Sequence, residues 1–106
     1  MHVPDSVVDP LSIDFGQVDI GHTNVHTVFV DNIGAANLDV TAVTLSGSSD
    51  FSVSSGGLPG VLVQFAQATA YVTYAPSDDV DDSATLTFAS NDPDEPTVDV
   101  LLYGEP

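Results

Sequence analysis

Residues 84–93, ATLTFASNDP, carry the clearest strand pattern in the chain. Ala84, Leu86 and Phe88 alternate with polar residues, which is the period-two pattern of a strand with one buried face. The Ser-Asn-Asp-Pro sequence at 90–93 is typical of a turn, because Asn and Asp cap turns with their side chains and Pro cannot donate to a sheet. This unit of strand and turn predicts a sheet that buries one face.

The same unit recurs along all 106 residues. Its other apolar alternations are Leu11-Ile13-Phe15, Val28-Val30, Leu38-Val40, Val43-Leu45, Phe51-Val53, Val61-Val63-Phe65, Ala70-Val72-Tyr74 and Val98-Val100-Leu102. Gly, Pro, Asn and Asp separate them at intervals of about 8–15 residues, and no stretch of any length shows helical spacing. We predict an all-β immunoglobulin-like β-sandwich of seven to eight mostly antiparallel strands, which forms one domain over residues 1–106.

One change of parity interrupts this pattern. The apolar series that contains Leu38 and Val40 continues with Val43 and Leu45, so that odd positions replace even ones. An extra residue in one strand restores the pairing after such a change, which predicts a bulge or strand break near Thr41-Ala42.

The charge of the chain is strongly one-sided, with 16 acidic residues, no Lys or Arg and a net charge of −16. Nucleic acids and anionic membranes are bound by cationic side chains, so neither is an expected partner. The same composition excludes a Schiff-base lysine and an arginine phosphate clamp, and the absence of Cys excludes thiolate chemistry. Three interpretations of the charge stay open: a solvated surface that keeps a β protein soluble, a saline or calcium-rich medium, and specific cation binding.

The ordered set of motifs resembles a known family. It consists of IDFGQVDIG at 13–21, VFVDNIG at 28–34, LDV at 38–40, VTLSG at 43–47, FSV at 51–53, VTYAP at 72–76, ATLTF at 84–88, SNDP at 90–93 and VLLYG at 100–104. This set is similar to the ASH/hydin-type domain, an immunoglobulin-like module related to the major sperm protein fold and found in bacterial choice-of-anchor D surface proteins.

The resemblance runs from about Val7 to Gly104 and implies a fold and a type of role. None of the motif residues is catalytic in the family, so the resemblance implies no enzyme. One segment departs from the pattern: family members commonly have a Pro-Gly turn where this chain has residues 65–69, FAQAT. The conformation of that turn is left open.

Two groups of acidic residues are candidate cation sites. Asp78, Asp79, Asp81 and Asp82 crowd one predicted loop, and such oxygen-rich loops bind Ca²⁺, although the spacing is not that of an EF-hand. The alternative interpretation is a solvated acidic turn. The second group, in the NDPDEP sequence at 91–96, is interpreted as a turn that holds no metal.

Outward-facing apolar residues are candidates for interaction. Phe29, Tyr71, Leu101 and Tyr103, together with Val25, occupy the outward parity of their strands, where grouped apolar side chains mark contacts. His22 and His26 are not expected to share a ligand, because the first lies in a predicted loop and the second has inward parity.

The leading hypothesis is a non-catalytic structural or interaction module of an extracellular or cell-surface protein. It would serve as a stalk, adhesive spacer or filament subunit, with neighbouring copies or domains of the same protein as partners. An alternative is a glycan- or peptide-binding module that uses Phe29, Tyr71 and Tyr103 as platforms. A third is an intracellular scaffold, as the resemblance to ciliary hydin-type proteins implies. Ca²⁺ is the one candidate cofactor, and an export signal is expected to lie outside this sequence.

Overall fold

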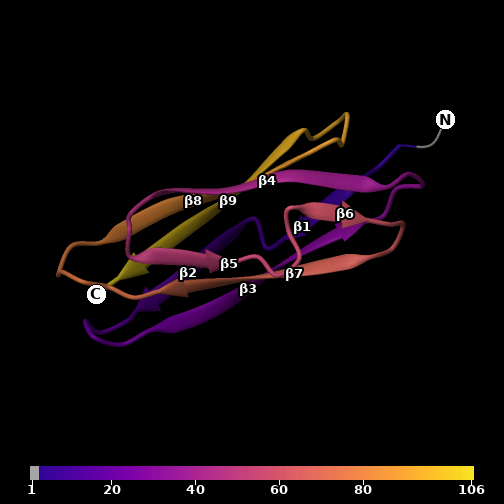
Figure 1. Ribbon diagram of the computed structural model, residues 1–106. Coiled ribbons are helices and arrows are strands. Elements are labelled where there is room, and N and C mark those ends of the chain that lie inside the picture. Colours follow the sequence, from indigo (N-terminus) through magenta and orange to yellow (C-terminus); the bar gives the residue numbers. More distant parts are fainter. Residues whose placement is uncertain (1–2) are drawn as a thin grey trace.

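A computed structural model describes residues 3–106, which form nine strands (Figure 1). The strands are β1 (Ser6–Asp9), β2 (Ser12–Gln17), β3 (Asn24–Asn32), β4 (Leu38–Gly47), β5 (Phe51–Ser54), β6 (Gly60–Leu62), β7 (Gln67–Tyr74), β8 (Asp82–Ser90) and β9 (Thr97–Glu105). The first two residues of the predicted domain 1–106 lie outside the described residues. Within residues 3–106 there is no helix of a length and apolarity that could cross a membrane.

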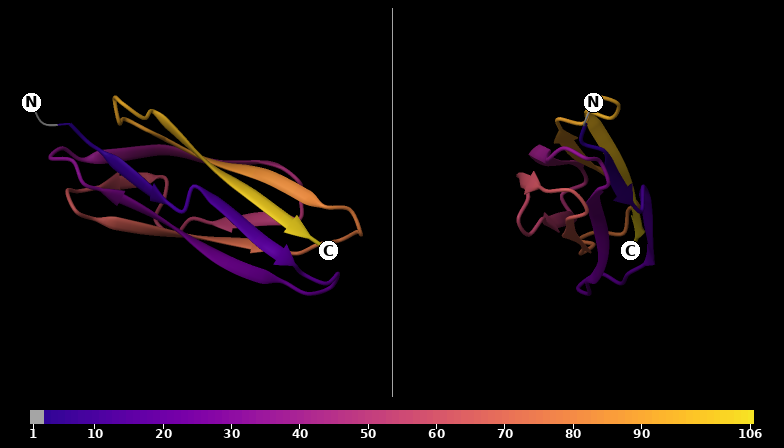
Figure 2. Two further views of the ribbon diagram at one scale, coloured as in Figure 1. Left: turned by 180° about the vertical axis from the view of Figure 1, so that it is seen from behind. Right: turned by 90° about the vertical axis from the view of Figure 1, so that its right-hand side faces the viewer.

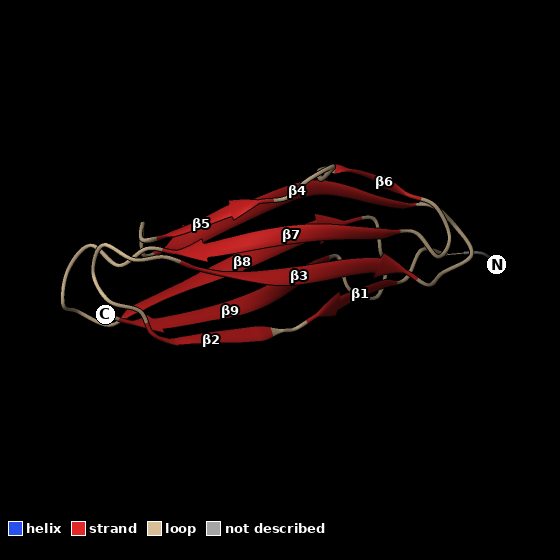
Figure 3. Cartoon of the chain, turned by 90° about the horizontal axis from the view of Figure 1, so that it is seen from below, coloured by secondary structure: helices blue, strands red, loops and turns tan. Residues whose placement is uncertain are grey.

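The strands form two sheets that face one another (Figure 3). Sheet A has the order β1-β3-β7-β5, and sheet B has the order β2-β9-β8-β4-β6. Every pairing is antiparallel except that of β2 with β9. The predicted all-β, mostly antiparallel sandwich is confirmed. The described residues form nine strands, one more than the upper limit of the seven to eight expected. The additional strand is β1, in which Val8 is the only buried apolar residue; burial alternates along it, but its sequence, SVVD, shows no apolar–polar alternation.

The core lies between the sheets and consists mostly of predicted inward positions, to which Val8, Val18, Leu58 and Leu62 are added. Ile13, Val30, Val72 and Leu86 are all buried, and the largest side chain without any exposed surface is Tyr74. Its ring stacks on Phe51 with centroids 4.7 Å apart. A Cβ at Gly104 would collide with the Tyr74 ring, so only glycine fits where β9 passes this side chain.

The predicted bulge is confirmed, because the register between β4 and β8 shifts between Val40 and Ala42. The shift restores the inward direction of the next apolar residues of β4, and Val43 and Leu45 pack against the core from partly buried positions.

The predicted inward series Val61-Val63-Phe65 is wrong. Strand β6 ends at Leu62, and Leu62 is the buried residue of this segment, while all three predicted residues are exposed. The chain turns directly after Leu62, because the Ala66 N–H donates to the Val63 carbonyl at 3.0 Å. The turn that the resemblance left open therefore contains Phe65, which adopts a left-handed φ of 66°. Leu11 was also expected to face inward and is exposed, because β2 begins after it.

Residues 3–106 form a rod with extents of 51 × 19 × 17 Å, and the two ends of this described stretch lie at opposite ends of the rod (Figure 2). The β3–β4 and β6–β7 loops lie at the end where the chain starts. The β2–β3, β4–β5 and β7–β8 loops lie at the end where it finishes. We call these the N-terminal end and the C-terminal end of the rod.

Candidate functional site

An acidic cluster lies at the C-terminal end. Asp50 follows β4, Asp78 lies in the β7–β8 loop and Asp82 begins β8, and one carboxylate oxygen of each lies within 4.8 Å of the others. The Asp50 carboxylate accepts hydrogen bonds from the Ser77 hydroxyl at 2.7 Å and from its N–H at 3.1 Å. Both bonds lower the pKa of Asp50, and the bond from the hydroxyl has the larger effect.

This cluster contains two of the four residues predicted to bind Ca²⁺. Asp78 and Asp82 meet in it, whereas Asp79 and Asp81 do not belong to it, and Asp50 was missed. The β4–β5 and β7–β8 loops meet because β5 pairs with the end of β7, which places Phe51 opposite Tyr74. Oxygen ligands suit Ca²⁺, and cation binding at Asp78 and Asp82 stays a prediction.

The Asp82 carboxylate also accepts a hydrogen bond of 2.7 Å from the Tyr74 hydroxyl. The second Asp82 oxygen accepts a hydrogen bond from the Ser48 hydroxyl at 2.8 Å. Burial is the main reason that the pKa of Tyr74 lies well above its ordinary value, and the hydrogen bond to Asp82 raises this pKa further. The tyrosine is therefore a neutral hydrogen-bond donor that joins the acidic cluster to the core.

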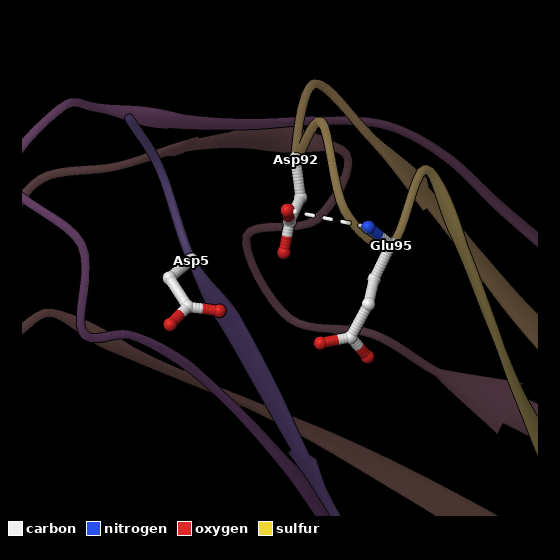
Figure 4. Close-up of side chains that lie close together, drawn as sticks. All are labelled: Asp5, Asp92 and Glu95. Carbon is white, nitrogen blue, oxygen red and sulfur yellow. Dashed lines mark hydrogen bonds between the residues drawn. The ribbon is translucent and has the colours of Figure 1, made fainter. Parts of the chain in front are cut away.

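A second acidic group surrounds Asp92, whose side chain is 1% exposed (Figure 4). One of its oxygens accepts bonds from the N–H and the hydroxyl of Ser6, and the other accepts bonds from the N–H groups of Asp94 and Glu95. Burial acts to raise the pKa of Asp92, but these four bonds outweigh it and lower the pKa.

Through these hydrogen bonds Asp92 connects β1 to the loop between β8 and β9. The carboxylates of Asp5 and Glu95 approach it closely, within 4.8 Å for one oxygen of each. The sequence indicated a turn here, and the turn is present. The burial of Asp92 was missed, since its partner Ser6 belongs to the strand that the pattern did not reveal.

The predicted interaction residues are exposed, and they divide between two opposite faces. Phe29 and Tyr71 lie on the outer face of sheet A. Thr27 is the residue opposite Tyr71, which makes Val25 and Phe29 the diagonal neighbours of Tyr71 on β3. Residues 51–77, which include β5 and β7, contain no acidic residue, so this part of the face is uncharged. On the other side of Phe29, Asp9 of β1 lies directly opposite it.

Leu101 and Tyr103 lie on the outer face of sheet B, on β9. They border a shallow groove of about 200 Å³, whose other lining residues are Ser46, Gly47, Ser83, Ala84 and Thr85. Asp14 of β2 lies opposite Tyr103 on the side away from Ser83. The tyrosine ring can stack on a flat apolar surface of a ligand, and the neighbouring hydroxyl-bearing side chains can form hydrogen bonds to the edges of that ligand.

His22 and His26 occupy separate environments, as predicted. His26 packs edge-on against Phe15 with ring centroids 4.6 Å apart. His22 lies in the β2–β3 loop, where it lines an open polar depression with Asp19 and Asn24. In the part of the chain that the structure describes, neither histidine belongs to a group of metal-ligating side chains.

A family model described as HYDIN/CFA65/VesB-like, Ig-like domain matches residues 7–105. This match confirms the resemblance to ASH/hydin-type immunoglobulin-like domains. No curated protein sequence matches the chain.

Several solved structures share the fold at low sequence identity. A protein of unknown function from Porphyromonas gingivalis W83 has a TM-score of 0.82 and 17% identity over 97% of this chain, which spans only 47% of that protein's chain. The ASH/PapD-like domain 7 of human CEP192 has a TM-score of 0.77 and 17% identity, and the match covers 97% of this chain and 85% of that one. The VesB protease of Vibrio cholerae has a TM-score of 0.71 and 18% identity over 95% of this chain and 32% of VesB.

Proposed function

The chain belongs to the HYDIN/CFA65/VesB-like family of Ig-like domains, and we propose that it is a non-catalytic spacer or filament module of an extracellular or cell-surface protein. Its partners in this role are neighbouring copies or domains of the same protein. The module supplies length and contact surfaces and carries out no reaction of its own.

The observation that carries this proposal is that residues 3–106, the described part of the chain, begin and finish at opposite ends of a 51 Å rod (Figure 2). Domains with this arrangement join in series without folding back, so each adds nearly its full length. The net charge of −16 supports the proposal, because like charges keep neighbouring surfaces apart unless a specific contact holds them.

The location of the native protein tests this proposal. We expect an antibody raised against the folded 106-residue chain to label intact cells that produce the native protein. Labelling only after permeabilisation would overturn the extracellular role and favour the alternative, an intracellular scaffold.

The groove beside Tyr103 favours a second function, the binding of a glycan or peptide. Its lining combines the Tyr103 ring and Leu101 with the hydroxyls of Ser46, Ser83 and Thr85, a combination that suits stacking and hydrogen bonding. Screening of a glycan and peptide panel tests this function. A ligand of this groove would bind the Tyr71→Ala variant normally and lose affinity for Tyr103→Ala, whereas equal losses or no binding at all would contradict it.

A further inference from the structure

The strands nearest the two ends of the described chain run in one direction along the rod. β1, β2 and β9 all run from the N-terminal end toward the C-terminal end (Figure 2). A force that pulls Val3 and Pro106 apart therefore acts along these strands and not across them. The chain has no cysteine, so no disulfide shares such a force, and hydrogen bonds and packing have to carry it.

The parallel pairing of β2 with β9 opposes this force. Tension from the start of the chain pulls β2 toward the N-terminal end, while tension from the other side pulls β9 toward the C-terminal end. The two strands would have to slide past one another, and the evenly spaced hydrogen bonds of a parallel pair share that load. Before β2 the Leu101 N–H donates to the Leu11 carbonyl at 3.0 Å. After β2 the Val18 N–H donates to the Glu105 carbonyl at 2.7 Å, so the bonds span the whole strand.

Packing of the core adds to this resistance. Ile13 and Phe15 of β2 are buried, and so are Val100 and Leu102 of β9. Sliding of β2 along β9 removes these side chains from close-packed positions. On its other side β9 is paired with β8 along its full length, so it does not leave the sheet by itself.

Strand β1 receives the force before β2 does. It forms one edge of sheet A, is paired only with β3, and buries one apolar side chain, Val8. Its start is held to Asp92, whose carboxylate accepts bonds from the Ser6 N–H at 2.9 Å and the Ser6 hydroxyl at 3.1 Å. Once β1 has detached, the load passes to β2, which is anchored by two large core side chains.

We propose that the domain bears tension along the rod, and that the parallel β2–β9 pair is the contact that limits its unfolding under force. β1 and its bonds to Asp92 form a latch that opens first. Opening of this latch adds little length, because β1 already lies along the direction of pulling. The inference rests on the proposed role of the domain as one unit of a series, in which each unit transmits force through its two ends.

The test compares two directions of pulling on the folded chain by single-molecule force spectroscopy. In the first, handles are attached to the two ends of the 106-residue chain. In the second, they are attached to Pro106 and to the single thiol that Asp81→Cys introduces at an exposed residue beside the start of β8. Asp82 lies opposite Gly104 in the antiparallel β8–β9 ladder, so this second pull opens the ladder one residue pair at a time.

We expect the first direction to require a several-fold higher force than the second. Forced unfolding is governed by the unfolding rate and not by the free energy of unfolding, so the two directions differ although the folded chain is the same. The matched control is the Asp81→Cys chain pulled by its ends, which should unfold at the force of the original chain. Equal forces in the two directions would overturn the proposal.

Asp92→Asn distinguishes the latch from the pair that limits unfolding. The substitution weakens the bonds to Ser6 and lowers the stability measured in urea, but the unfolding force between the chain ends should stay unchanged. A fall of this force would show that β1 limits unfolding and would overturn the assignment to β2 and β9. Failure of either test would leave the spacer role intact, since that role is tested by the location of the native protein.

Discussion

The hydroxyl of Tyr74 donates a 2.7 Å hydrogen bond to Oδ2 of Asp82, and this bond links the end of β7 in sheet A to the beginning of β8 in sheet B. The ring of Tyr74 is fully buried, whereas Asp82 is partly exposed in the acidic cluster. The bond thus connects the core of the sandwich to the group of carboxylates at its C-terminal end.

Tyr74→Phe removes this bond and keeps the ring. We expect a loss of about 1.5–3 kcal/mol in the free energy of unfolding, the usual range for a hydrogen bond to a charged partner, measured by urea unfolding. Tyr71→Phe is the matched control, because that ring lies half-exposed on the outer face of sheet A. An equal effect of both substitutions would contradict the account.

The same pair predicts a dependence of stability on pH. Burial, and next the bond to Asp82, raises the pKa of Tyr74 in the folded chain above its unfolded value of about 10. The unfolded chain loses this proton first as the pH rises, so the contribution of Tyr74 is complete below pH 10 and declines above it. Tyr74→Phe should show a smaller loss of stability than the original chain between about pH 9 and 11.

Asp92→Asn weakens the connection between β1 and the β8–β9 loop. The amide retains one acceptor oxygen, but its NH₂ group faces groups that donate hydrogen bonds to the carboxylate in the original chain. We therefore expect the free energy of unfolding to fall by about 2–3 kcal/mol at neutral pH. The folded pKa of Asp92 is lowered, so its contribution is present above the unfolded pKa of about 3.8 and is lost as the pH falls through the folded pKa.

Thermal unfolding as a function of pH measures this contribution. Asp92→Asn should lose less stability than the original chain on acidification below about pH 4. Asp94→Asn serves as the control, because Asp94 is exposed and its side chain supplies none of the bonds around Ser6. Identical acid profiles for the Asp92→Asn variant and the original chain would contradict the assigned role.

Phe65→Gly should stabilise the single chain. It relieves a left-handed conformation that is unfavourable by roughly 1–2 kcal/mol, and the greater freedom of glycine in the unfolded chain offsets about half of this. We expect a net gain of about 0.5–1 kcal/mol by urea unfolding. Phe65→Ala keeps the Cβ and should give no such gain, and a loss on Phe65→Gly would show that the ring contributes within the domain.

Calcium should raise the melting temperature of the chain through Asp50, Asp78 and Asp82 if the predicted site binds it. The gain grows with ion concentration and reaches about 2.7 kcal/mol at one hundred times the dissociation constant. Asp78→Asn should reduce the gain, and Asp79→Asn, which alters a residue outside the cluster, should not. A melting temperature that does not change between calcium and chelator would remove the metal site from the account.

Alternation of apolar residues was enough to predict most of the fold. It identified eight of the strand segments, the side that faces the core in all of them except β6, and the bulge after Val40. It failed in β1, whose inward residues are Ser6 and Val8, and in β6, whose inward residue is Leu62. Both failures have the same cause, since an apolar residue of each strand, Val7 or Val61, faces outward and hides the alternation.

The candidate sites were less predictable because they depend on contacts between distant segments. Asp50 comes close to Asp78 because β5 pairs with β7 and because Ser77 donates hydrogen bonds to Asp50. Asp92 is polar and lies in a turn, so its burial under β1 could not be read from its neighbours. Parity placed Tyr71 and Tyr103 on outer faces correctly, but it does not specify the sheet to which each strand belongs, and the two residues lie on opposite faces.

The length of the native protein tests the spacer role most directly. Insertion of one additional copy of the 106-residue chain beside the original should lengthen the particle seen by electron microscopy by about 51 Å, the long dimension of the rod. An unchanged length, or a particle that thickens where the copy was inserted, would contradict the account.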